Sequence, residues 1–433
     1  MHPNLSFEQA PPITVPYRFF LTAPLFGVAA GLLLAWLGES AVASRWSSGA
    51  LALTHLLAVG FMLQAMTGAM MQFVPVAAGG NVWRPGLVAS LVHPALVIGA
   101  GALVTAFLVH DGWLFRLAGG TLLATIGFVA AVVGIALWRT PAQGATIHSM
   151  RLAIVGLAAT ALLGATLAEG LAGEVAWPLL ELANVHAGWG LGGWALLLLA
   201  GVSYYVVPMF QLTPPYPVGL ARWLAPAVLA ILLLWSAQVG GRSPAWEQWV
   251  WLAGLMMGAG FASVTLWLQQ RRRRRVSDPT LVFFRGAMLC MIGLLLSAVM
   301  MAMFPGLAEH PRAPYWLGVL VLPGVFVSAI NGMLYKIVPF LNWLHLQRLM
   351  GLGMLPPNMK EMIAERAMKL QMRMHFAAVV LLLAGAVVPE ATRIAGIIFA
   401  ISCAMLGWNL TQAARFFRDF RDRTRATAPD RAP

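Results

Sequence analysis

Two histidines lie in apolar stretches, where an imidazole ring is an unusual residue. His55 falls five residues into an apolar run over 50–76, and His186 occupies a similar depth in the run over 178–208. A polar ring in such a stretch is costly and is usually functional, and imidazole nitrogen is a common ligand of haem iron and of copper. The sequence therefore makes both residues candidate metal ligands, with a hydrogen bond to a neighbouring helix as the alternative role of each.

The surroundings of the two histidines differ. Glu181 precedes His186 by one helical turn and a residue, so its carboxylate is a candidate partner that would orient the imidazole from outside the metal's ligand set. His55 lies 20 residues before Pro75, whereas His186 lies 22 residues before Pro208. Because two residues turn a helix by about 200°, we expect the two rings to lie on different faces and not to ligate one metal symmetrically.

The remaining candidate groups have less specific settings. His93 precedes Pro94, which predicts a helix kink with a hydrogen-bonded side chain. His110 and His310 fall beside acidic residues in expected loops, where a solvated ring is expected and capture of a metal is the alternative. Lys336 is expected to reach the membrane surface near its helix end. Three further histidines are expected to reach that surface as well: His148, His345 and His375.

The segments that carry these residues must lie in a bilayer. The chain of 433 residues is 60% hydrophobic and 10% charged, whereas soluble domains carry about 25% charged residues. Twelve apolar runs approach the length of about 20 residues that spans a membrane. They are 17–38, 50–76, 87–109, 113–138, 151–171, 178–208, 222–241, 246–269, 280–304, 314–340, 374–388 and 392–413, and the short eleventh run is expected to recruit flanking residues.

The basic residues orient these runs. Five of the 28 Lys and Arg residues fall on one side (Arg45, Arg116, Arg242, Arg312 and Arg393), and the other 23 fall on the side of both termini. The positive-inside rule then places both termini in the cytoplasm of a bacterial-type inner membrane. The net charge of +13 does not indicate a nucleic-acid partner, because the run 271–275 flanks two spans and suits anionic lipid. The lipid bilayer is the expected partner.

A motif of Gly, six residues and Pro occurs three times. The copies are GAMMQFVP (Gly68–Pro75), GVSYYVVP (Gly201–Pro208) and GMLYKIVP (Gly332–Pro339), at nearly constant spacing in the second, sixth and tenth runs. Gly allows a neighbouring helix to approach closely, and Pro is expected to end each helix. The spacing predicts an all-α polytopic membrane protein with twelve transmembrane helices in three four-helix repeats (about 17–138, 151–269 and 280–413), arranged with pseudo-threefold symmetry.

The expected domain organisation follows from these runs. Residues 1–16 form a cytoplasmic tail, 17–413 form a single membrane domain, and 414–433 form a basic cytoplasmic tail. The loop 341–373 contains apolar and charged residues at helical intervals over Asn358–Met372, which predicts an interfacial amphipathic helix. Cys290 and Cys403 lie in apolar segments and are expected to be buried thiols. The 23 methionines suit helix packing, with soft copper(I) ligation as the alternative.

Three four-helix units with the marked helix second in each resemble subunit I of the haem-copper oxidase superfamily, which includes cytochrome oxidases and nitric oxide reductases. The run from His55 to Pro75 resembles the second helix of the nitric oxide reductase branch, whose outer His ligates the low-spin haem. The run from His186 to Pro208 is placed like the sixth helix, whose His ligates the non-haem metal. The resemblance implies b-type haem bound by His55, with copper as a further cofactor at His186.

The chain departs from that superfamily at two helices. The family's tenth helix carries two haem-ligating His, but Pro314–Phe340 has none; its seventh helix carries a His pair, but Arg222–Gly241 has none. A standard binuclear centre cannot be assembled, so any oxidoreductase activity of the oxidase type would have an incomplete ligand set. The chain resembles degenerate stand-alone relatives of subunit I, such as the NnrS family, which is tied to the nitrosative-stress response and reported to carry haem.

Three functions are therefore consistent with the sequence. The first is a haem-binding, or haem- and copper-binding, membrane protein of respiratory electron transfer or nitric oxide response. The second is a copper or haem transporter or assembly factor that serves a respiratory complex. The third is a partner subunit that kept the fold without any cofactor. An absorption spectrum of the purified protein distinguishes the three.

Overall fold

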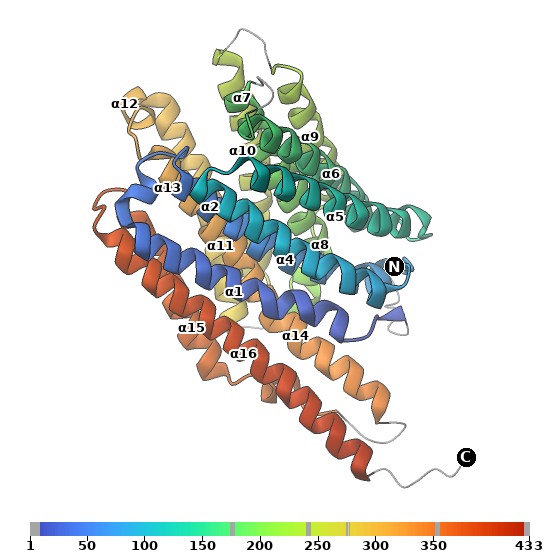
Figure 1. Cartoon of the computed structure of the whole chain (residues 1–433). Coiled ribbons are helices and arrows are strands. Elements are labelled where there is room, and N and C mark those ends of the chain that lie inside the picture. The colour runs from blue at the N-terminus through green and yellow to red at the C-terminus, as the bar shows by residue number, and fades with distance from the viewer. Residues whose placement is uncertain are drawn as a thin grey trace.

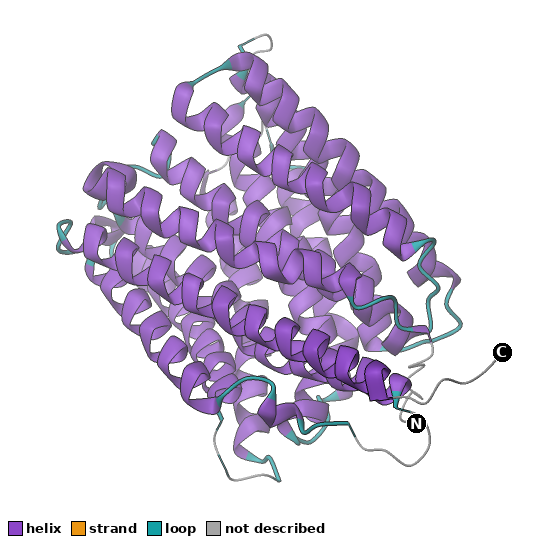
Figure 2. Ribbon diagram, turned by 60° about the horizontal axis from the view of Figure 1, so that its bottom comes forward, coloured by secondary structure: helices purple, strands orange, loops and turns teal. Residues whose placement is uncertain are grey.

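The structure is a computed structural model that describes residues 9–173, 178–239, 244–273, 276, 278–350 and 356–427, without the side chains of 244–247 and 425–427. Within these ranges the chain is helical and contains no strand. Twelve helices in this part of the chain are long and apolar enough to cross a membrane. The expected all-α, multi-pass class is confirmed, and Figure 2 shows the helices running side by side as one bundle.

The spanning segments follow the expected runs closely. Nine are single helices: α1 (Thr14–Leu37), α4 (Pro85–Val109), α5 (Gly112–Arg139), α6 (Ala145–Leu171), α9 (Val218–Ser236), α10 (Pro244–Gln270), α11 (Pro279–Met303), α15 (Glu365–Ala384) and α16 (Ala391–Thr427). The other three are interrupted by a π-helical segment: α2–η3–α3 (Ser48–His55, Leu56–Leu63, Gln64–Ala78), α7–η4–α8 (Leu179–Gly188, Trp189–Leu196, Leu197–Gln211) and α13–η5–α14 (Ala313–Val319, Leu320–Val327, Ser328–Leu349). Short helices η2 (Gly38–Val42), α12 (Pro305–Ala308) and η6 (Met359–Glu361) connect them.

The π-helical segments occupy the same position in the second, sixth and tenth spanning helices. Each is eight residues long. Each ends twelve residues before the Pro of its Gly–Pro motif, at residues 63, 196 and 327 before 75, 208 and 339. π-Helical turns are rare overall but frequent at functional sites, so their recurrence in these three helices marks this part of the bundle as a candidate functional region.

The motif glycines allow close helix contacts, as expected from the sequence. A Cβ atom on Gly68 would lie 2.8 Å from Cβ of Phe19, and one on Gly201 would lie 2.8 Å from Cβ of Ser149. In the tenth helix, a Cβ on Gly332 would lie 2.9 Å from Cβ of Phe283. Each motif glycine therefore lets its helix pack directly against the spanning helix that precedes it in the chain.

The expectation that each motif proline ends its helix is wrong. Pro75, Pro208 and Pro339 all lie inside helices, which continue to Ala78, Gln211 and Leu349. Proline removes one backbone donor and crowds the preceding turn, but in membrane helices neighbouring helices, hydroxyl side chains and local changes of helix type satisfy the freed backbone groups. Proline in these helices is thus an internal feature and does not mark the membrane boundary.

The first and last spanning helices close the bundle. Among the described helices, α1 and α16 share the most extensive contact. A Cβ on Gly31 would lie 2.6 Å from the carbonyl oxygen of Gly396, and a Cβ on Gly396 would lie 2.6 Å from that of Gly31. The two backbones therefore touch through reciprocal glycines. Figure 1 shows the start of α1 and the end of α16 at one end of the bundle, which we call the terminal face; the opposite end is the far face.

The loop before the eleventh span differs from the expectation. The predicted amphipathic helix over Asn358–Met372 is not a separate element: η6 covers Met359–Glu361, and residues from Glu365 onward form the first turns of α15. Met362 and Ile363 between them are buried in the core, which fixes the chain as it enters the membrane helix. The short eleventh run recruits residues on its N-terminal side, as expected. The predicted basic tail is also helical through Thr427.

Lys336 does not simply reach the membrane surface. Its Nζ atom lies 3.1 Å from Oδ2 of Asp278, and this carboxylate also accepts a hydrogen bond from the backbone N–H of Leu281 at the start of α11. Partial burial works to raise the pKa of Asp278, but the Thr280 hydroxyl and the Lys336 charge outweigh it and lower this pKa. The ion pair therefore links α11 to α14 near the terminal face.

Replacing Asp278 with asparagine is expected to lower the free energy of unfolding by about 1–2 kcal/mol at pH 7, because the helix cap is kept and the charge pairing is lost. A carboxyl group whose pKa is lower in the folded protein stabilises the fold at pH values above its ordinary pKa of about 4. This stabilisation disappears as the pH falls through the lowered pKa. The difference in unfolding temperature between wild type and Asp278→Asn should therefore shrink below about pH 4. The exposed Asp419→Asn is the control; an unchanged difference at low pH would contradict the assignment.

Candidate functional site

His55 and His186 lie beside each other near the far face. Their ring centroids are 6.4 Å apart and their planes differ by 20°. His55 ends α2 directly before the π segment η3, and His186 lies in the last turn of α7 before η4. The structure therefore brings together the two residues that the sequence marked as candidate ligands.

The two rings meet although their offsets from Pro75 and Pro208 place them on inequivalent faces of their own helices. Those offsets would keep the rings apart only if both helices turned the same side toward the site. The two helices belong to different parts of the bundle and present different sides to the space between them. Rings that differ by about 200° in helical phase can therefore still meet, as the 6.4 Å separation demonstrates.

Backbone carbonyl groups hold both rings through the Nδ1 atom. His55 Nδ1 lies 2.8 Å from the carbonyl oxygen of Leu51, and His186 Nδ1 lies 3.1 Å from that of Thr160 on α6. A carbonyl oxygen only accepts hydrogen bonds, so each Nδ1 carries the proton and each Nε2 keeps its lone pair. This is the usual arrangement of a metal-ligating histidine, in which the other nitrogen donates to a carbonyl or carboxylate.

The separation of the two rings suits one metal between them. Metal–nitrogen bonds of about 2.0–2.1 Å, with about 1.1 Å more from nitrogen to ring centroid, place the centroids of two opposed imidazoles about 6.2 Å apart. The observed 6.4 Å agrees with this value. No group of three or more His, Cys, Asp or Glu residues gathers anywhere in the described ranges. His55 and His186 are the residues that would hold a haem or a copper(I) ion at this place.

The residues around the pair were only partly expected. The Thr160 carbonyl takes the place on His186 Nδ1 that we expected for the Glu181 carboxylate, and Glu181 is exposed in the first turn of α7. Gly164 provides room, because a Cβ there would lie 3.0 Å from Cε1 of His186. The ring of Phe107 lies 5.0 Å from that of His55. Thr160 and Gly164 were not predicted, although small residues four apart do indicate close helix contact.

The other histidines lie away from the pair. His93 Nε2 is 2.8 Å from the hydroxyl of Thr22, which confirms the expected hydrogen-bonded side chain. His110 Nε2 is 2.8 Å from the hydroxyl of Ser48 near the far face. His310 accepts a hydrogen bond from the backbone of Arg312. These contacts give each ring a structural partner.

Two of the three histidines expected at the membrane surface are held within the protein. His375 is fully buried, and its Nε2 lies 2.7 Å from the hydroxyl of Ser328, so the expectation that it reaches the surface is wrong. The rings of Phe283 on α11 and Phe399 on α16 lie against the His375 ring. His345 is half-buried against the carbonyl groups of Leu341 and Pro11. His148 is exposed, as expected.

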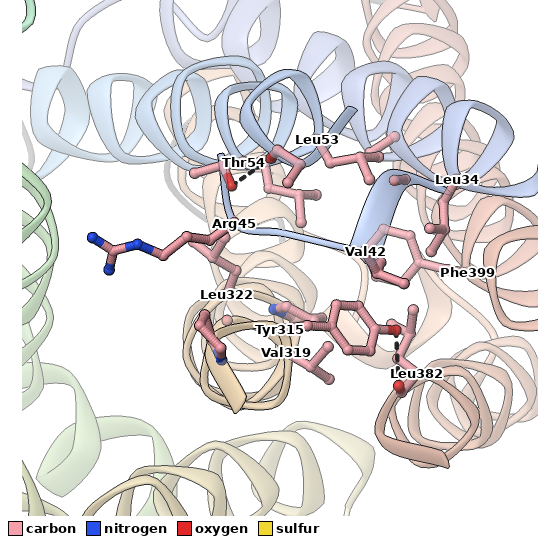
Figure 3. A pocket seen from close by; sticks show the side chains of 18 of the residues that line it. Leu34, Val42, Arg45, Leu53, Thr54, Tyr315, Val319, Leu322, Leu382 and Phe399 are labelled. Carbon is pink, nitrogen blue, oxygen red and sulfur yellow. Dashed lines mark hydrogen bonds between the residues drawn. The ribbon is translucent and has the colours of Figure 1, made fainter. Parts of the chain in front are cut away.

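Two cavities lie near the far face beside the histidine pair. One of about 140 Å³ lies among α1, α2, α13, η5, α15 and α16, and Figure 3 shows Tyr315 in it, donating its hydroxyl to the carbonyl of Leu382. The other, of about 400 Å³, lies among α7, η4, α9, α10, α11, α13 and η5. Arg45 and Gly318 line both, whereas His55 and His186 line neither. The histidine pair therefore lies outside the lining of both cavities, and the two cavities adjoin each other at Arg45 and Gly318.

Comparison with known proteins finds no protein-family model that matches this chain and no matching curated protein. A function must therefore be argued from the geometry of the site.

Proposed function

We propose that this chain is a membrane protein that binds b-type haem between His55 and His186 and serves respiratory electron transfer or the nitric oxide response. The observation that carries the proposal is the pair of near-parallel imidazoles, each with Nδ1 on a carbonyl and Nε2 available for a metal. Haem b would supply reversible one-electron chemistry at its iron. The chain's own part is to orient both rings and to surround them with apolar residues such as Phe107.

Copper is the second candidate for the same donors. Two neutral imidazoles bind copper(I) well, and a third ligand is not required. A copper-bearing protein would fit the alternative role of transporter or assembly factor for a respiratory complex.

We further propose the pseudo-threefold arrangement of three four-helix repeats. The equivalent π segments and the equivalent contacts of the motif glycines support it. So do two similar ring contacts, one in the first repeat and one in the third: Phe19 with His93 and Phe283 with His375, each with centroids 5.4 Å apart. In both, a ring from the first helix of a repeat meets a histidine from the third.

The two-residue offset of the histidine pair has a natural explanation in such a ring. Units related by rotation about an axis contact each other head to tail. The residue that one helix turns toward its neighbour therefore has a different place in the repeat from the residue that the neighbour turns back toward it. His55 lies eight residues before the end of its π segment and His186 lies ten residues before the end of its own. An offset pair is therefore the expected form of a single site between two repeats.

The other two repeat boundaries carry different residues at the corresponding positions. Between the sixth and tenth helices they are Gly188 and Leu317, and both line the 400 Å³ cavity. Between the tenth and second helices they are Val319 and Leu53, and both line the 140 Å³ cavity. All three boundaries thus hold either an imidazole pair or a cavity at one level, which supports a common descent of the repeats.

This arrangement accords with the resemblance to subunit I of the haem-copper oxidases, as a member without the binuclear centre. In the described parts of the seventh and tenth spanning helices, 218–236 and 313–349, the one histidine is His345, bonded at the terminal face. Placement in a bacterial-type inner membrane with both termini in the cytoplasm rests on the arginine distribution. Partners among respiratory or assembly proteins belong to the same proposal.

An absorption spectrum of the purified protein tests the proposal. We expect a Soret band of six-coordinate low-spin haem, with about one haem per chain. His55→Ala and His186→Ala should each remove one axial ligand and convert the spectrum to a five-coordinate form, and the double variant should lose the haem. His148→Ala, at an exposed position, should leave the spectrum unchanged.

The outcomes separate the candidate functions. A colourless protein with one copper per chain that both histidine variants lose would replace haem with the copper candidate. A protein that binds neither cofactor when expressed with both in excess would leave only the cofactor-free partner subunit, and the proposed function would be wrong.

A further inference from the structure

The larger cavity near the far face has walls that contain little side-chain bulk. Its volume is about 400 Å³, within the range of small-molecule sites. Five glycines line it: Gly188, Gly192, Gly254, Gly258 and Gly318. The remaining lining is almost entirely aliphatic and aromatic, with Trp235, Trp251 and Phe326 among the larger side chains.

Three of the five glycines face open space. A Cβ on Gly318 would meet no atom within 4 Å, and one on Gly254 would come no closer than 3.9 Å to Ile231. A Cβ on Gly192 would likewise stay 3.9 Å from its nearest neighbours. The cavity therefore lies along exposed backbone on three different spanning helices and has the smooth walls that suit a flat or chain-like apolar body.

The polar groups of the cavity lie at its far-face end. Among the described lining residues Arg45 is the one with a charge, and its guanidinium donates a hydrogen bond to the side-chain oxygen of Asn184, which also lines the cavity. Arginine has only donors, and the described part of the lining contains no acidic residue. The lining disfavours a cationic ligand and favours one whose polar end carries oxygen acceptors.

We propose that this cavity binds an apolar molecule drawn from the membrane whose head carries hydrogen-bond-accepting oxygens, held near Arg45 and Asn184. A quinone ring with its carbonyl groups and a fatty acid with its carboxylate share this chemistry. The apolar body lies against the open glycines and Trp251, and the head faces the donors. The site is separate from the histidine pair, so it stands whether or not that pair binds a metal.

The test uses the full-length protein in phosphatidylcholine nanodiscs. Tryptophan fluorescence is titrated with a short-chain ubiquinone in one series and with a brominated fatty acid in the other, since both quench tryptophan on contact. We expect saturable quenching by at least one probe. Gly254→Leu and Gly318→Leu place a side chain in the cavity and should reduce the affinity at least tenfold.

A matched control lies on the same helix as Gly254. Gly260 is exposed on α10 and a Cβ there would meet nothing within 4 Å, so Gly260→Leu changes the same helix without filling the cavity. Saturable quenching by the quinone alone assigns a quinone site, and by the fatty acid alone an acyl site. Quenching that is non-saturable, or equal in Gly254→Leu and Gly260→Leu proteins with unchanged unfolding temperatures, would overturn the proposal.

Discussion

Gly164→Val is expected to abolish binding at the histidine pair while the protein stays folded. A Cβ at this position would already lie 3.0 Å from Cε1 of His186, and the two further methyl groups of valine leave the ring no room in its present orientation. The ring must rotate away from the Thr160 carbonyl and from His55. Because a ligand displaced by about 1 Å already fails to meet a metal with fixed bond lengths, we expect at least a tenfold loss of haem or copper occupancy.

Cofactor content and unfolding temperature together measure this effect. Gly120→Val on α5 is the control, since Gly120 is exposed and a Cβ there would meet no atom within 4 Å. Both variants carry the same helix-propensity cost of valine. Full occupancy in Gly164→Val would mean that His186 does not hold the cofactor in the orientation described here.

Gly156→Leu should have the largest effect on stability. A Cβ on Gly156 would lie 2.2 Å from the carbonyl oxygen of Gly193, which is backbone in the π segment η4 and cannot move aside as a side chain can. Separating α6 from η4 would also move Thr160, one turn further along the same face, away from His186. We expect a loss of about 3 kcal/mol or more, at the upper end for overpacked sites.

Thermal unfolding in detergent and the yield of monodisperse protein measure this loss. Gly127→Leu on α5 provides the same substitution at an exposed position with nothing within 4 Å. Equal unfolding temperatures for the two variants would show that α6 and η4 are not in the backbone contact described.

The sequence predicted the spanning helices well because apolar length alone determines which segments enter a bilayer. Composition could not predict the π segments, since they depend on which backbone groups pair and not on side-chain polarity. The motif prolines were misjudged for a related reason: a membrane helix tolerates an internal proline that would end a water-exposed helix. His375 was misplaced because its span begins at Glu365, about two and a half turns before the apolar run suggested.

The histidine pair was predicted as two residues and not as one site. Helical phase along a single chain says where a side chain lies on its own helix, but the meeting of His55 with His186 depends on how two helices turn toward each other. That rotation is set by backbone contacts such as Gly156 with Gly193 and by the carbonyl of Thr160, which belongs to a third helix. None of these contacts is visible as a pattern within one apolar run.

The reciprocal glycines of α1 and α16 have a consequence for the connectivity of the protein. Gly31 and Gly396 lie 365 positions apart in the sequence, yet their helices form the most extensive contact among those described. The first and last spanning helices are therefore neighbours in the bundle although they are far apart along the chain. A circularly permuted chain, with the old ends joined by a linker at the terminal face and new ends opened in the connection between α5 and α6, would keep every helix beside its present neighbours.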